Sequence, residues 1–411
     1  MQISKKQLSL VNERIQQLLK ARSFYGKKLR DNGVDGVSSP ADFQKLPFSE
    51  KKDLRNAYPL SLMSVPEEQI IRVHSSSGTT GKPVIIPYTK KDIEDWAMLF
   101  ARCYEMAGIT SKDRVQITPG YGLWTAGIGF QAGCELLGAM TIPMGPGNTD
   151  KQIQMMMDLR TTVLCATSSY ALLLAETIES RNLRDKIYLK KGIIGSERWG
   201  EKMRHSIIEK LGVDIYDIYG LTEIYGPGIG ISCNAQKGIH YWDDYIYLEI
   251  IDPKSGENLP DGKWGEIVIT TLLKEGAPLI RFRTHDISRI LPGACPCGNH
   301  FPRIDIIQGR TDDMVKIKGV NLFPSQIEEL LNSFPEVSSE YKIHISHLNG
   351  KDIMHLYVET NSDANFSELS TRIASMIKSR IGFTPIVNVV EVGVLPRSEK
   401  KTSRIIDTRY K

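Results

Sequence analysis

Residues 161–180 read TTVLCATSSYALLLAETIES, and this stretch decides the fold that the sequence predicts. Thr162–Thr167 is a short apolar run of the kind found in buried strands. Ser169–Ile178 then spaces its apolar residues with a period near 3.6, which is typical of a helix. A strand followed directly by a helix is the repeating unit of a parallel sheet with crossover helices.

The same alternation continues on both sides of this unit, from about residue 67 to residue 220. Further strand-like runs are Val115–Ile117, Ala139–Pro143 and Gly192–Ser196, and further helical segments are Gly127–Leu137 and Glu201–Leu211. Because strands and helices alternate in this way, we expect an α/β fold with a doubly wound parallel sheet at its core.

Residues 240–308 have a different character. The segments YIYLEIIDP, GEIVITTL and LIRFRTH are rich in strand-forming residues, and SGENLPDG and LPGACPCG interrupt them. We therefore expect an antiparallel, β-rich subdomain at about residues 232–308, attached to the α/β core.

The C-terminal part of the chain predicts a separate, small α+β unit. Ser325-x-x-Glu328 has the pattern of a capping box at the start of a helix, and Asn349-Gly350 is typical of a hairpin turn. A second helix would end at Gly382. The expected domains are a large N-terminal one, residues 1–310, and a small mobile C-terminal one, residues 311–411.

Composition places the chain among ordinary globular proteins. It has 411 residues, of which 41% are hydrophobic and 24% charged, and its formal net charge is +4. So small a basic excess, without a block of like charges, argues against nucleic acid or an acidic membrane surface as a partner. MQISKKQLSLVNERIQQLLK at the start lacks the apolar core of a signal peptide, and no run is long enough to span a membrane. We therefore expect a soluble, cytoplasmic protein.

The strongest local signal for chemistry is HSSSGTTGKPV at residues 74–84. Glycines allow backbone N–H groups to approach phosphates closely, and the hydroxyls and Lys82 add further donors. The stretch is not a Walker loop, since Ser76 stands where that pattern requires a glycine and Pro83 follows the lysine. Taken alone, the competing interpretation is a Ser/Gly-rich surface turn.

Two shorter motifs carry carboxylates. Glu223, in YGLTE at residues 219–223, could hold Mg²⁺, because this ion prefers a few carboxylates together with phosphate oxygens. Asp286, at the end of RFRTHD, could bind ribose hydroxyls. The competing interpretations are a capped loop for the first motif and, for the second, a surface ion pair with Arg281 or Arg283.

These motifs occur together with GRTDDMVKIKGVNLFP and LPRSEKKTSRIID in the order found in the adenylate-forming (ANL) superfamily. Within it the chain most resembles the phenylacetate–CoA ligases, through LPFSEKKDLRNAYP, GYGLWTAG, GNT at 147–149, DIYGLTEIYGPG and GVNLFPSQIE. The likeness covers nearly the whole chain. It implies ATP-dependent activation of a carboxylic acid, aryl or arylacetic, to an acyl-adenylate with release of pyrophosphate. The acyl group would then pass to the thiol of coenzyme A with release of AMP.

Carried over position by position, the resemblance assigns roles to individual residues. The ATP phosphates would be wrapped by Ser75, Ser76, Ser77, Gly78, Thr79, Thr80, Gly81 and Lys82. The adenine would be bordered by Ser196, Glu197 and Arg198, with Asp217, Ile218, Tyr219 and Gly220 nearby. Thr222 and Glu223 would serve the phosphates and Mg²⁺, and Asp286 and Arg310 would bind the ribose. The acid pocket would be lined by Tyr121, Gly122 and Trp124, and the coenzyme A tunnel by Lys316 and Gly319.

The chemistry of the reaction fits these roles. Attack of a carboxylate on the α-phosphate brings two anions together, so the site must supply positive charge. Lys82, Mg²⁺ at Glu223 and Lys401 would supply it, with Lys401 reaching the acid carboxylate and the α-phosphate. Asp312 would be the hinge, and rotation about it would remove Lys401 and bring the Lys316–Gly319 face to the site to admit the thiol.

Two positions depart from the family pattern. Lys400 stands where the family has a glycine before Lys401, so either lysine could serve adenylation. Arg198 stands before Trp199 where a proline is expected, and it would either pair with a polar or acidic group of the acid or face solvent. Both departures argue against phenylacetate itself as the acid without changing the reaction type.

The six cysteines fall into two groups. Three lie in apolar or helical contexts and are expected to be buried, reduced thiols: Cys103, Cys134 and Cys165. The other three combine with an imidazole into the ligand set of a closed tetrahedral structural zinc site: Cys233, His240, Cys295 and Cys297. The alternatives are three reduced thiols at a loop, or His285 or His300 as the imidazole.

Three functions are weighed on this basis. The first is an acid–CoA ligase, and the second is an enzyme that loads the acyl group onto a carrier-protein thiol or an amine. The third is a nucleotide-binding paralogue without turnover, which is disfavoured because every charged residue required for turnover is present: Lys82, Glu223, Asp286, Arg310 and Lys401. A homodimer is an expectation of the family alone, and the sequence does not name the acid.

Overall fold

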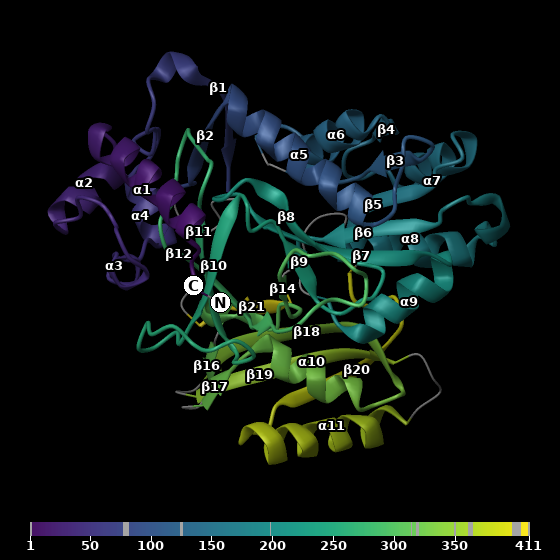
Figure 1. Ribbon diagram of the computed structural model, residues 1–411. Helices are drawn as coiled ribbons and strands as arrows, with labels where there is room; N and C mark the ends of the chain where they lie inside the picture. Colours follow the sequence, from purple (N-terminus) through teal and green to yellow (C-terminus); the bar gives the residue numbers. More distant parts are fainter. Residues whose placement is uncertain are drawn as a thin grey trace.

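The structure is a computed structural model that describes residues 2–76, 82–123, 126–197, 199–313, 315–317, 320–348, 351–360, 365–396 and 404–409. A nine-stranded and a four-stranded sheet with their helices form most of the N-terminal part, and another four-stranded sheet with two helices forms a unit at the C-terminal end (Figure 1). Among the described residues, no helix combines the length and apolar character needed to cross a membrane.

A nine-stranded sheet forms the centre of the N-terminal part, in the order β13-β14-β9-β8-β7-β6-β5-β3-β4. Its strands are β3 (Arg114–Ile117), β4 (Met140–Pro143), β5 (Val163–Thr167), β6 (Lys191–Gly195), β7 (Asp214–Leu221), β8 (Gly226–Ser232), β9 (Ile239–Tyr241), β13 (Ile290–Leu291) and β14 (Arg303–Ile304). Strands β4, β3, β5, β6 and β7 pair in parallel, and each strand beyond β7 pairs antiparallel. The predicted α/β fold with a parallel core is therefore confirmed.

Helices cover both faces of the parallel strands, because successive strand residues point to opposite sides. In β5, Val163 and Cys165 belong to a buried cluster with residues of α5 and α6, whereas Leu164 and Ala166 belong to one with residues of α7, α8 and α9. The last residue of β5, Thr167, caps α8 by accepting a hydrogen bond from the N–H of Tyr170. The helices are α5 (Lys90–Met106), α6 (Ala126–Leu137), α7 (Thr149–Asp158), α8 (Ser168–Ser180) and α9 (Glu201–Leu211).

The β-rich segment predicted at residues 232–308 contributes to two sheets. Strands β9, β13 and β14 extend the central sheet, whereas β10 (Ile246–Ile251), β11 (Gly265–Thr271) and β12 (Phe282–Ser288) pair with β15 (Gly309–Arg310) in a four-stranded sheet. Four N-terminal helices lie beside this second sheet (Figure 1): α1 (Lys5–Lys20), α2 (Phe24–Asp31), α3 (Pro40–Gln44) and α4 (Lys51–Asn56). Val11, Ile15 and Leu18 of α1 share a buried cluster with Tyr247 and Ile280.

Shorter elements connect these layers. Strands β1 (Ile70–Ser75) and β2 (Ile85–Thr89) pair antiparallel, and the predicted phosphate loop lies between them in the sequence. Single 3₁₀ turns are η1 (Glu67–Gln69), η2 (Arg184–Lys186) and η3 (Thr311–Asp313). The last of these contains Asp312, so the predicted hinge lies in a turn directly after β15.

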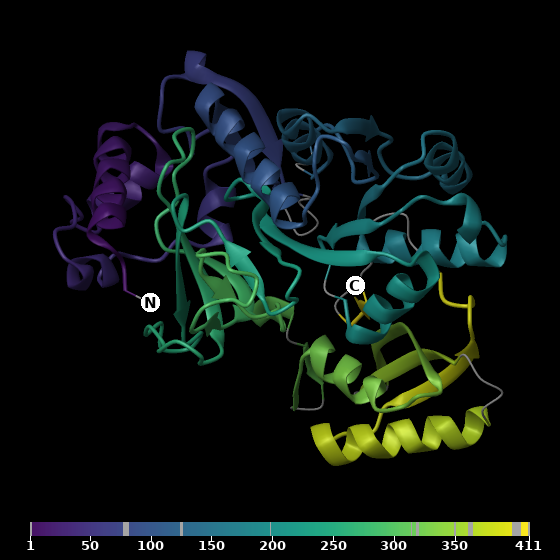
Figure 2. The ribbon, with the colours of Figure 1, turned by 45° about the vertical axis from the view of Figure 1, so that its right-hand side comes forward.

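The C-terminal unit has its own core and lies below the larger sheets in both views, with α11 on its outer side (Figures 1 and 2). Its sheet has the order β20-β19-β18-β21, and a small hairpin of β16 and β17 precedes it. The elements are β16 (Val315–Ile317), β17 (Val320–Leu322), α10 (Pro324–Asn332), β18 (Val337–Leu348), β19 (Lys351–Thr360), α11 (Phe366–Ile381), β20 (Ile386–Glu391) and β21 (Ile405–Asp407).

Two local predictions in this unit have different outcomes. Gly382 ends α11 in the left-handed region at φ +100°, as the sequence predicts. The capping box at Ser325-x-x-Glu328 is wrong, because α10 already begins at Pro324 and the N–H of Phe323 donates to the Gln326 side chain at 3.0 Å. Proline is well suited to a first helical position, since its φ is already helical and it has no N–H to satisfy.

Gly133 of α6 permits close packing against α5. A Cβ at this position would lie 2.3 Å from Cβ of Phe100 and 2.9 Å from the backbone nitrogen of Ala101. We expect Gly133→Ala to lower the free energy of unfolding by about 1–3 kcal/mol, because the two helices must separate. Urea denaturation measures this. Leu136→Ala, at a residue 53% exposed on the same helix, should change it by less than about 0.5 kcal/mol, and equal effects would contradict the packing argument.

Candidate active site

The candidate active site lies where the carboxyl ends of β6 and β7 meet. Strand β7 pairs in parallel with β6 and antiparallel with β8, so the strand direction reverses here. Ligands of open α/β sheets bind outside the carboxyl ends of the parallel strands, and the residues that follow β6 and β7 lie at that edge of the sheet. The described residues predicted for the adenine and phosphate region lie on these strands or directly after them: Ser196, Glu197, Asp217, Ile218, Tyr219, Gly220, Thr222 and Glu223.

Glu197 is held by the start of α8. Its Oε2 accepts hydrogen bonds from Ser168 Oγ at 3.0 Å, from the N–H of Ser169 at 3.0 Å and from Ser169 Oγ at 2.5 Å. A carboxylate at a helix N-terminus is favourable, because the first N–H groups of a helix lack partners within it. This arrangement fixes the backbone turn that follows β6, where Ser196 adopts φ +71°.

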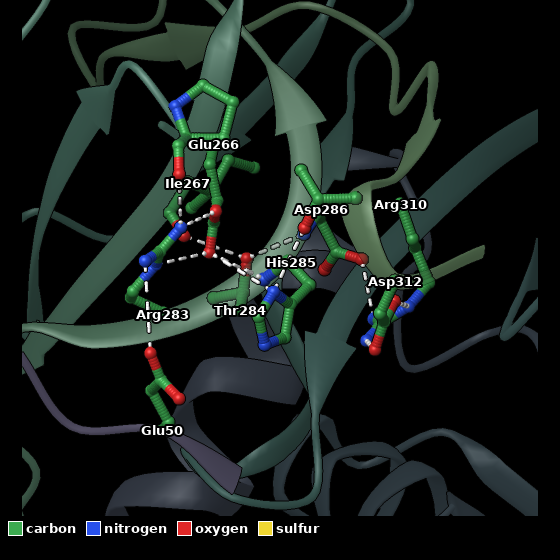
Figure 3. Close-up of polar contacts among 11 residues, drawn as sticks. Glu50, Glu266, Ile267, Arg283, Thr284, His285, Asp286, Arg310 and Asp312 are labelled. Carbon is green, nitrogen blue, oxygen red and sulfur yellow. Dashed lines mark hydrogen bonds and ion pairs between the residues drawn. The ribbon is translucent and has the colours of Figure 1, made fainter. Parts of the chain in front are cut away.

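The buried carboxylate of Asp286, in β12, connects three parts of the site. Tyr219 Oη donates to Asp286 Oδ2 at 2.8 Å, and Arg310 Nη1 donates to Oδ1 at 2.8 Å. Arg310 also pairs with Asp312 through Nε at 2.8 Å (Figure 3). Burial raises the pKa of Asp286, and the positive charge of Arg310 opposes that shift. The competing interpretation of a surface ion pair with an arginine of the RFRTHD motif is wrong, since both of those arginines pair with other carboxylates.

A second layer of contacts supports β12 next to the hinge (Figure 3). Glu266 of β11 is fully buried, and Arg283 donates to both of its oxygens, at 3.1 Å from Nε and 2.6 Å from Nη2. The N–H of His285 donates to the same carboxylate at 3.2 Å, and the His285 ring lies 2.9 Å from Thr311 Oγ1. His285 has φ +67°, which is uncommon for a residue other than glycine.

Glu223 lies just beyond β7 and is only 4% exposed. Lys51, the first residue of α4, places its Nζ 2.9 Å from Glu223 Oε1. The carboxylate predicted to hold Mg²⁺ therefore faces a cation from the N-terminal helices. In the sequence, Lys51 stands out only as part of the stretch LPFSEKKDLRNAYP, which gives it no role.

Lys274 is a buried lysine that interacts electrostatically with Glu223, and sequence reasoning missed it. Its side chain is fully buried, its Nζ donates to the carbonyl of Ile224, and it lies 4.3 Å and 4.9 Å from the ring centroids of Tyr88 and Tyr225. Burial lowers its pKa to about 7, and nearby carboxylates, including Glu223, oppose the shift. The sequence offers only a weak signal, a lysine followed by Glu275 within the largely apolar run TTLLKEGAPLI.

The base of the phosphate loop is closed by Ser76 and Val84. The N–H of Ser76 donates to the carbonyl of Val84 at 3.0 Å, and the N–H of Val84 donates to Ser76 Oγ at 3.2 Å. The N–H of Ser75 donates to the carbonyl of Leu123 at 2.9 Å. This last bond ties the loop to the segment that carries the predicted acid pocket.

Two further side chains flank the loop. His74 packs edge-on against Trp96, and its Nδ1 lies 3.3 Å from the carbonyl oxygen of Leu123. Burial lowers the pKa of His74 to about 4, so the ring is neutral near pH 7, which suits packing and not proton transfer. Lys82 lies 5.7 Å from the ring centroid of Tyr58.

In the predicted acid pocket, the hydroxyl of Tyr121 is buried and has no hydrogen-bond partner among the described residues. Gly122 follows it at φ +92°. Of Lys316 only the backbone, in β16, is described. The remaining predicted site residues lie outside the described residues: Ser77, Gly78, Thr79, Thr80, Gly81, Trp124, Arg198, Gly319, Lys400 and Lys401.

A cluster of three thiols and one imidazole lies at the edge of the central sheet. The ligand atoms of its members all lie within 4.8 Å of one another: Cys233, His240, Cys295 and Cys297. His240 Nδ1 lies 2.7 Å from the carbonyl oxygen of Phe301, which leaves Nε2 as the atom that faces Cys297 Sγ at 3.4 Å. A histidine that donates its other N–H to a carbonyl is the usual arrangement at a metal.

The other histidines considered for this cluster lie elsewhere. His285 belongs to the contacts around Glu266, and His300 stacks on Phe301 at 4.5 Å between centroids. The remaining three cysteines are buried, as predicted: Cys103, Cys134 and Cys165.

The fold and the site together define an adenylate-forming enzyme. In agreement, residues 18–272 match the AMP-binding enzyme family and residues 319–409 match the AMP-binding enzyme C-terminal domain. The chain is 41% identical over 383 residues to the phenylacetate-coenzyme A ligase of Pseudomonas putida, covering 91% of this chain and 87% of that protein. It is 40% identical over 396 residues to the one of Escherichia coli K12, covering 94% and 90%.

The chain therefore belongs to the phenylacetate–CoA ligase family. It is an AMP-forming acid–CoA ligase, which activates a carboxylic acid as an acyl-adenylate and passes the acyl group to coenzyme A.

Structures of one solved relative in two states match this chain to different degrees. The TM-score is 0.87 with 2-hydroxyisobutyryl-CoA ligase in the postadenylation state, at 27% identity, covering 98% of this chain and 89% of that one. It falls to 0.70 with the same ligase in the thioesterification state, also at 27% identity, with 99% and 90% covered. This chain therefore superposes more closely on the postadenylation structure of that ligase than on its thioesterification structure.

Asp217 of β7 is expected to make stability depend on pH. Burial raises its pKa from 3.8 to about 7, although Arg204 and a hydrogen bond with Trp199 oppose the shift. The folded state thus binds this proton more tightly than the unfolded state, and its contribution is lost as the pH rises through about 7.

Asp217→Asn removes the cost of burying an ionised carboxylate above about pH 7, because the asparagine amide carries no charge. We expect the melting temperature of the variant, relative to the unchanged protein, to be higher at about pH 8.5 than at about pH 5.5. Differential scanning calorimetry in both buffers measures it. Asp214→Asn, at an exposed position on the same strand, is the control, and an equal difference at both pH values for Asp217→Asn would contradict the assignment.

Proposed function

We propose that the acid is an aryl or arylacetic acid and that both half-reactions take place at the carboxyl ends of β6 and β7. In the first, a carboxylate oxygen attacks the α-phosphorus of ATP, and the bond to pyrophosphate breaks. In the second, the thiol of coenzyme A attacks the acyl carbonyl, loses its proton to solvent, and the bond to AMP breaks. The observation that carries the proposal is the chain of contacts from Tyr219 through Asp286 and Arg310 to Asp312.

In this proposal Asp286 and Arg310 hold the ribose of ATP. Each carboxylate oxygen of Asp286 accepts one hydrogen bond from protein and keeps a lone pair free for a ribose hydroxyl. Arg310 would contact the same ribose while it remains paired with Asp312, the proposed hinge. The C-terminal unit would begin at this hinge, which is supported by its separate core of residues from Val315 onward.

The Mg²⁺ ion is proposed to bind at Glu223. Mg²⁺ prefers oxygen ligands such as carboxylates. Glu223 offers a nearly buried carboxylate that already faces a charged group, the Lys51 ammonium. Mg²⁺ would neutralise phosphate charge there when bound. Lys51 is 35% exposed along its side chain and can turn from Glu223 to a phosphate oxygen, while Lys274 holds the carbonyl of Ile224 next to the carboxylate.

The identity of the acid rests on Tyr121 and on the relatives. The buried hydroxyl of Tyr121 has no partner among the described residues, and an aromatic ring with an available donor suits an aryl carboxylate. The most similar proteins quoted above are named for phenylacetate. The proposal does not fix which member of the aryl or arylacetic class is used, because Arg198 departs from the family pattern.

Acid-dependent exchange of labelled pyrophosphate into ATP tests the proposal directly. We expect exchange with benzoate-like or phenylacetate-like acids and little with short aliphatic acids, and acyl-CoA with AMP on addition of coenzyme A. Glu223→Gln should slow exchange by about 100-fold or more, since one charged group at the phosphates is lost. Glu257→Gln, at an exposed residue, should not. Exchange limited to aliphatic acids would reject the aryl assignment, and exchange without acyl-CoA would favour a carrier-protein or amine acceptor.

We further propose that the cluster of Cys233, His240, Cys295 and Cys297 holds a structural zinc ion. The cluster offers four ligand atoms within 4.8 Å, and the orientation of His240 is fixed by Phe301. Three thiolates and one imidazole form a closed set, which is typical of structural and not catalytic zinc. Such an ion would pin the loop between β13 and β14 against the end of β8.

Metal analysis of the purified protein tests the zinc site. We expect about one zinc per chain, and expect Cys295→Ser to lose it together with several degrees of melting temperature, because metal binding adds to folding stability. Cys134→Ser, at a buried cysteine outside the cluster, should keep the zinc. A protein purified without chelators that contains no zinc, or a Cys295→Ser variant that retains it, would overturn the assignment.

A further inference from the structure

Lys202 connects the N-terminal part to the C-terminal unit. It lies in the first turn of α9, and its Nζ donates to three backbone carbonyls, those of Leu331 at 3.1 Å, Phe334 at 2.6 Å and Val337 at 2.9 Å. All three acceptors belong to the C-terminal unit, at the end of α10 and the turn that leads into β18. One side chain of the N-terminal part thus holds one short segment of the other part.

The chemistry of this contact is well matched. Of the three acceptors only Leu331 belongs to α10, and its carbonyl lies at the end of the helix that carries the negative end of the dipole. The carbonyls of Leu331 and Phe334 also accept hydrogen bonds from the backbone N–H groups of Phe334 and Val337. An ammonium group has three N–H donors and no acceptor, so Lys202 can satisfy three carbonyls at once. Burial lowers the pKa of Lys202, and the charge of Glu336 opposes this shift.

The backbone next to Lys202 comes equally close to α10. A Cβ at Gly200 would lie 2.2 Å from Oε1 and 3.3 Å from Cγ of Glu328. Gly200 is the residue that precedes α9, so a glycine at this position lets the start of α9 approach the side of α10. The atom nearest to this Cβ position is the end of the Glu328 side chain, so α9 and α10 meet through Gly200 and Glu328 as well as through Lys202.

Similarity to a solved relative relates the Lys202 contact to one step of the reaction. The chain superposes on the postadenylation structure of 2-hydroxyisobutyryl-CoA ligase with a TM-score of 0.87, against 0.70 for the thioesterification structure of the same ligase. The acceptors of Lys202 lie beyond the proposed hinge at Asp312, so a rotation about this hinge would carry them away from α9 and break the three hydrogen bonds.

We propose that Lys202 is a positioning residue that docks the C-terminal unit for adenylate formation and must release the end of α10 before thioester formation. It does not touch the reacting atoms. It sets the fraction of time that the C-terminal unit spends in the first placement. A larger fraction favours adenylate formation, and a smaller fraction favours thioester formation. The inference rests on the two-step reaction of the family and on the hinge proposed above.

Lys202→Met tests the kinetic part, because methionine keeps the apolar stem and removes all three donors. Because hydrogen bonds from a charged group are lost, the equilibrium population of the first placement should fall about tenfold. We expect acid-dependent pyrophosphate exchange to slow by about that factor, while transfer from chemically prepared acyl-adenylate to coenzyme A stays equal or becomes faster. The control is Lys210→Met on the same helix, whose ion pair with Glu179 stays within the N-terminal part. Equal slowing of both half-reactions by Lys202→Met would overturn the proposal.

A disulfide trap tests the structural part without any substrate. Cysteines in a Gly200→Cys/Glu328→Cys variant should bridge only in the observed placement, since a Cβ at Gly200 would lie 3.3 Å from Cγ of Glu328, the atom that a sulfur would replace. Mass spectrometry follows disulfide formation in glutathione buffer. We expect the rate of formation to fall several-fold when Lys202→Met is added and to stay the same when Lys210→Met is added. Single-cysteine variants give the background from the native thiols.

The two measurements separate the possible failures. Unchanged bridging together with unchanged exchange would overturn the role of Lys202, whatever the acid. If bridging slows as expected but no acid supports exchange, the docking contact stands and the proposed substrate class fails.

Discussion

The buried carboxylate of Asp286 is the constraint on which the rest of the site depends. A charge taken out of water is costly unless it is paired and hydrogen-bonded, so its partners are held in place as strictly as the charge itself. Its partners are Tyr219, near the carboxyl end of β7 in the central sheet, and Arg310, just before the proposed hinge. The same interaction therefore fixes the two sheets relative to each other and the point from which the C-terminal unit departs.

Positive charge around Glu223 has a different origin. Lys51 comes from the N-terminal helices and Lys274 from the loop after β11, so neither belongs to the parallel strands. Lys274 is buried, and a carbonyl and two aromatic faces replace the water that it has lost. Positive charge beside a phosphate is a usual source of catalysis in phosphoryl transfer, and this is the role proposed for Lys51. Lys51 brings a helix outside the sheet next to Glu223.

The interface between the two parts differs from the interior of either. Each part has its own apolar core, whereas the contact at Lys202 consists of polar hydrogen bonds to three backbone carbonyls. Polar contacts are exchanged for water at little net cost, so an interface of this kind can open and close during a reaction cycle. Large apolar interfaces would hold the C-terminal unit in one placement and would prevent the second half-reaction.

By itself the sequence determined the parallel core, because the alternation of apolar period between strand and helix is a local property. It also determined Asp286, Arg310, Glu223 and the four members of the cysteine cluster as candidates, through their motifs and residue types. Only the tertiary structure decided that the strands of residues 232–308 divide between two sheets and that Lys51 and Lys274 stand beside Glu223. These contacts join residues far apart in the chain, and packing of whole elements, not local spacing, selects which of many similar side chains meet.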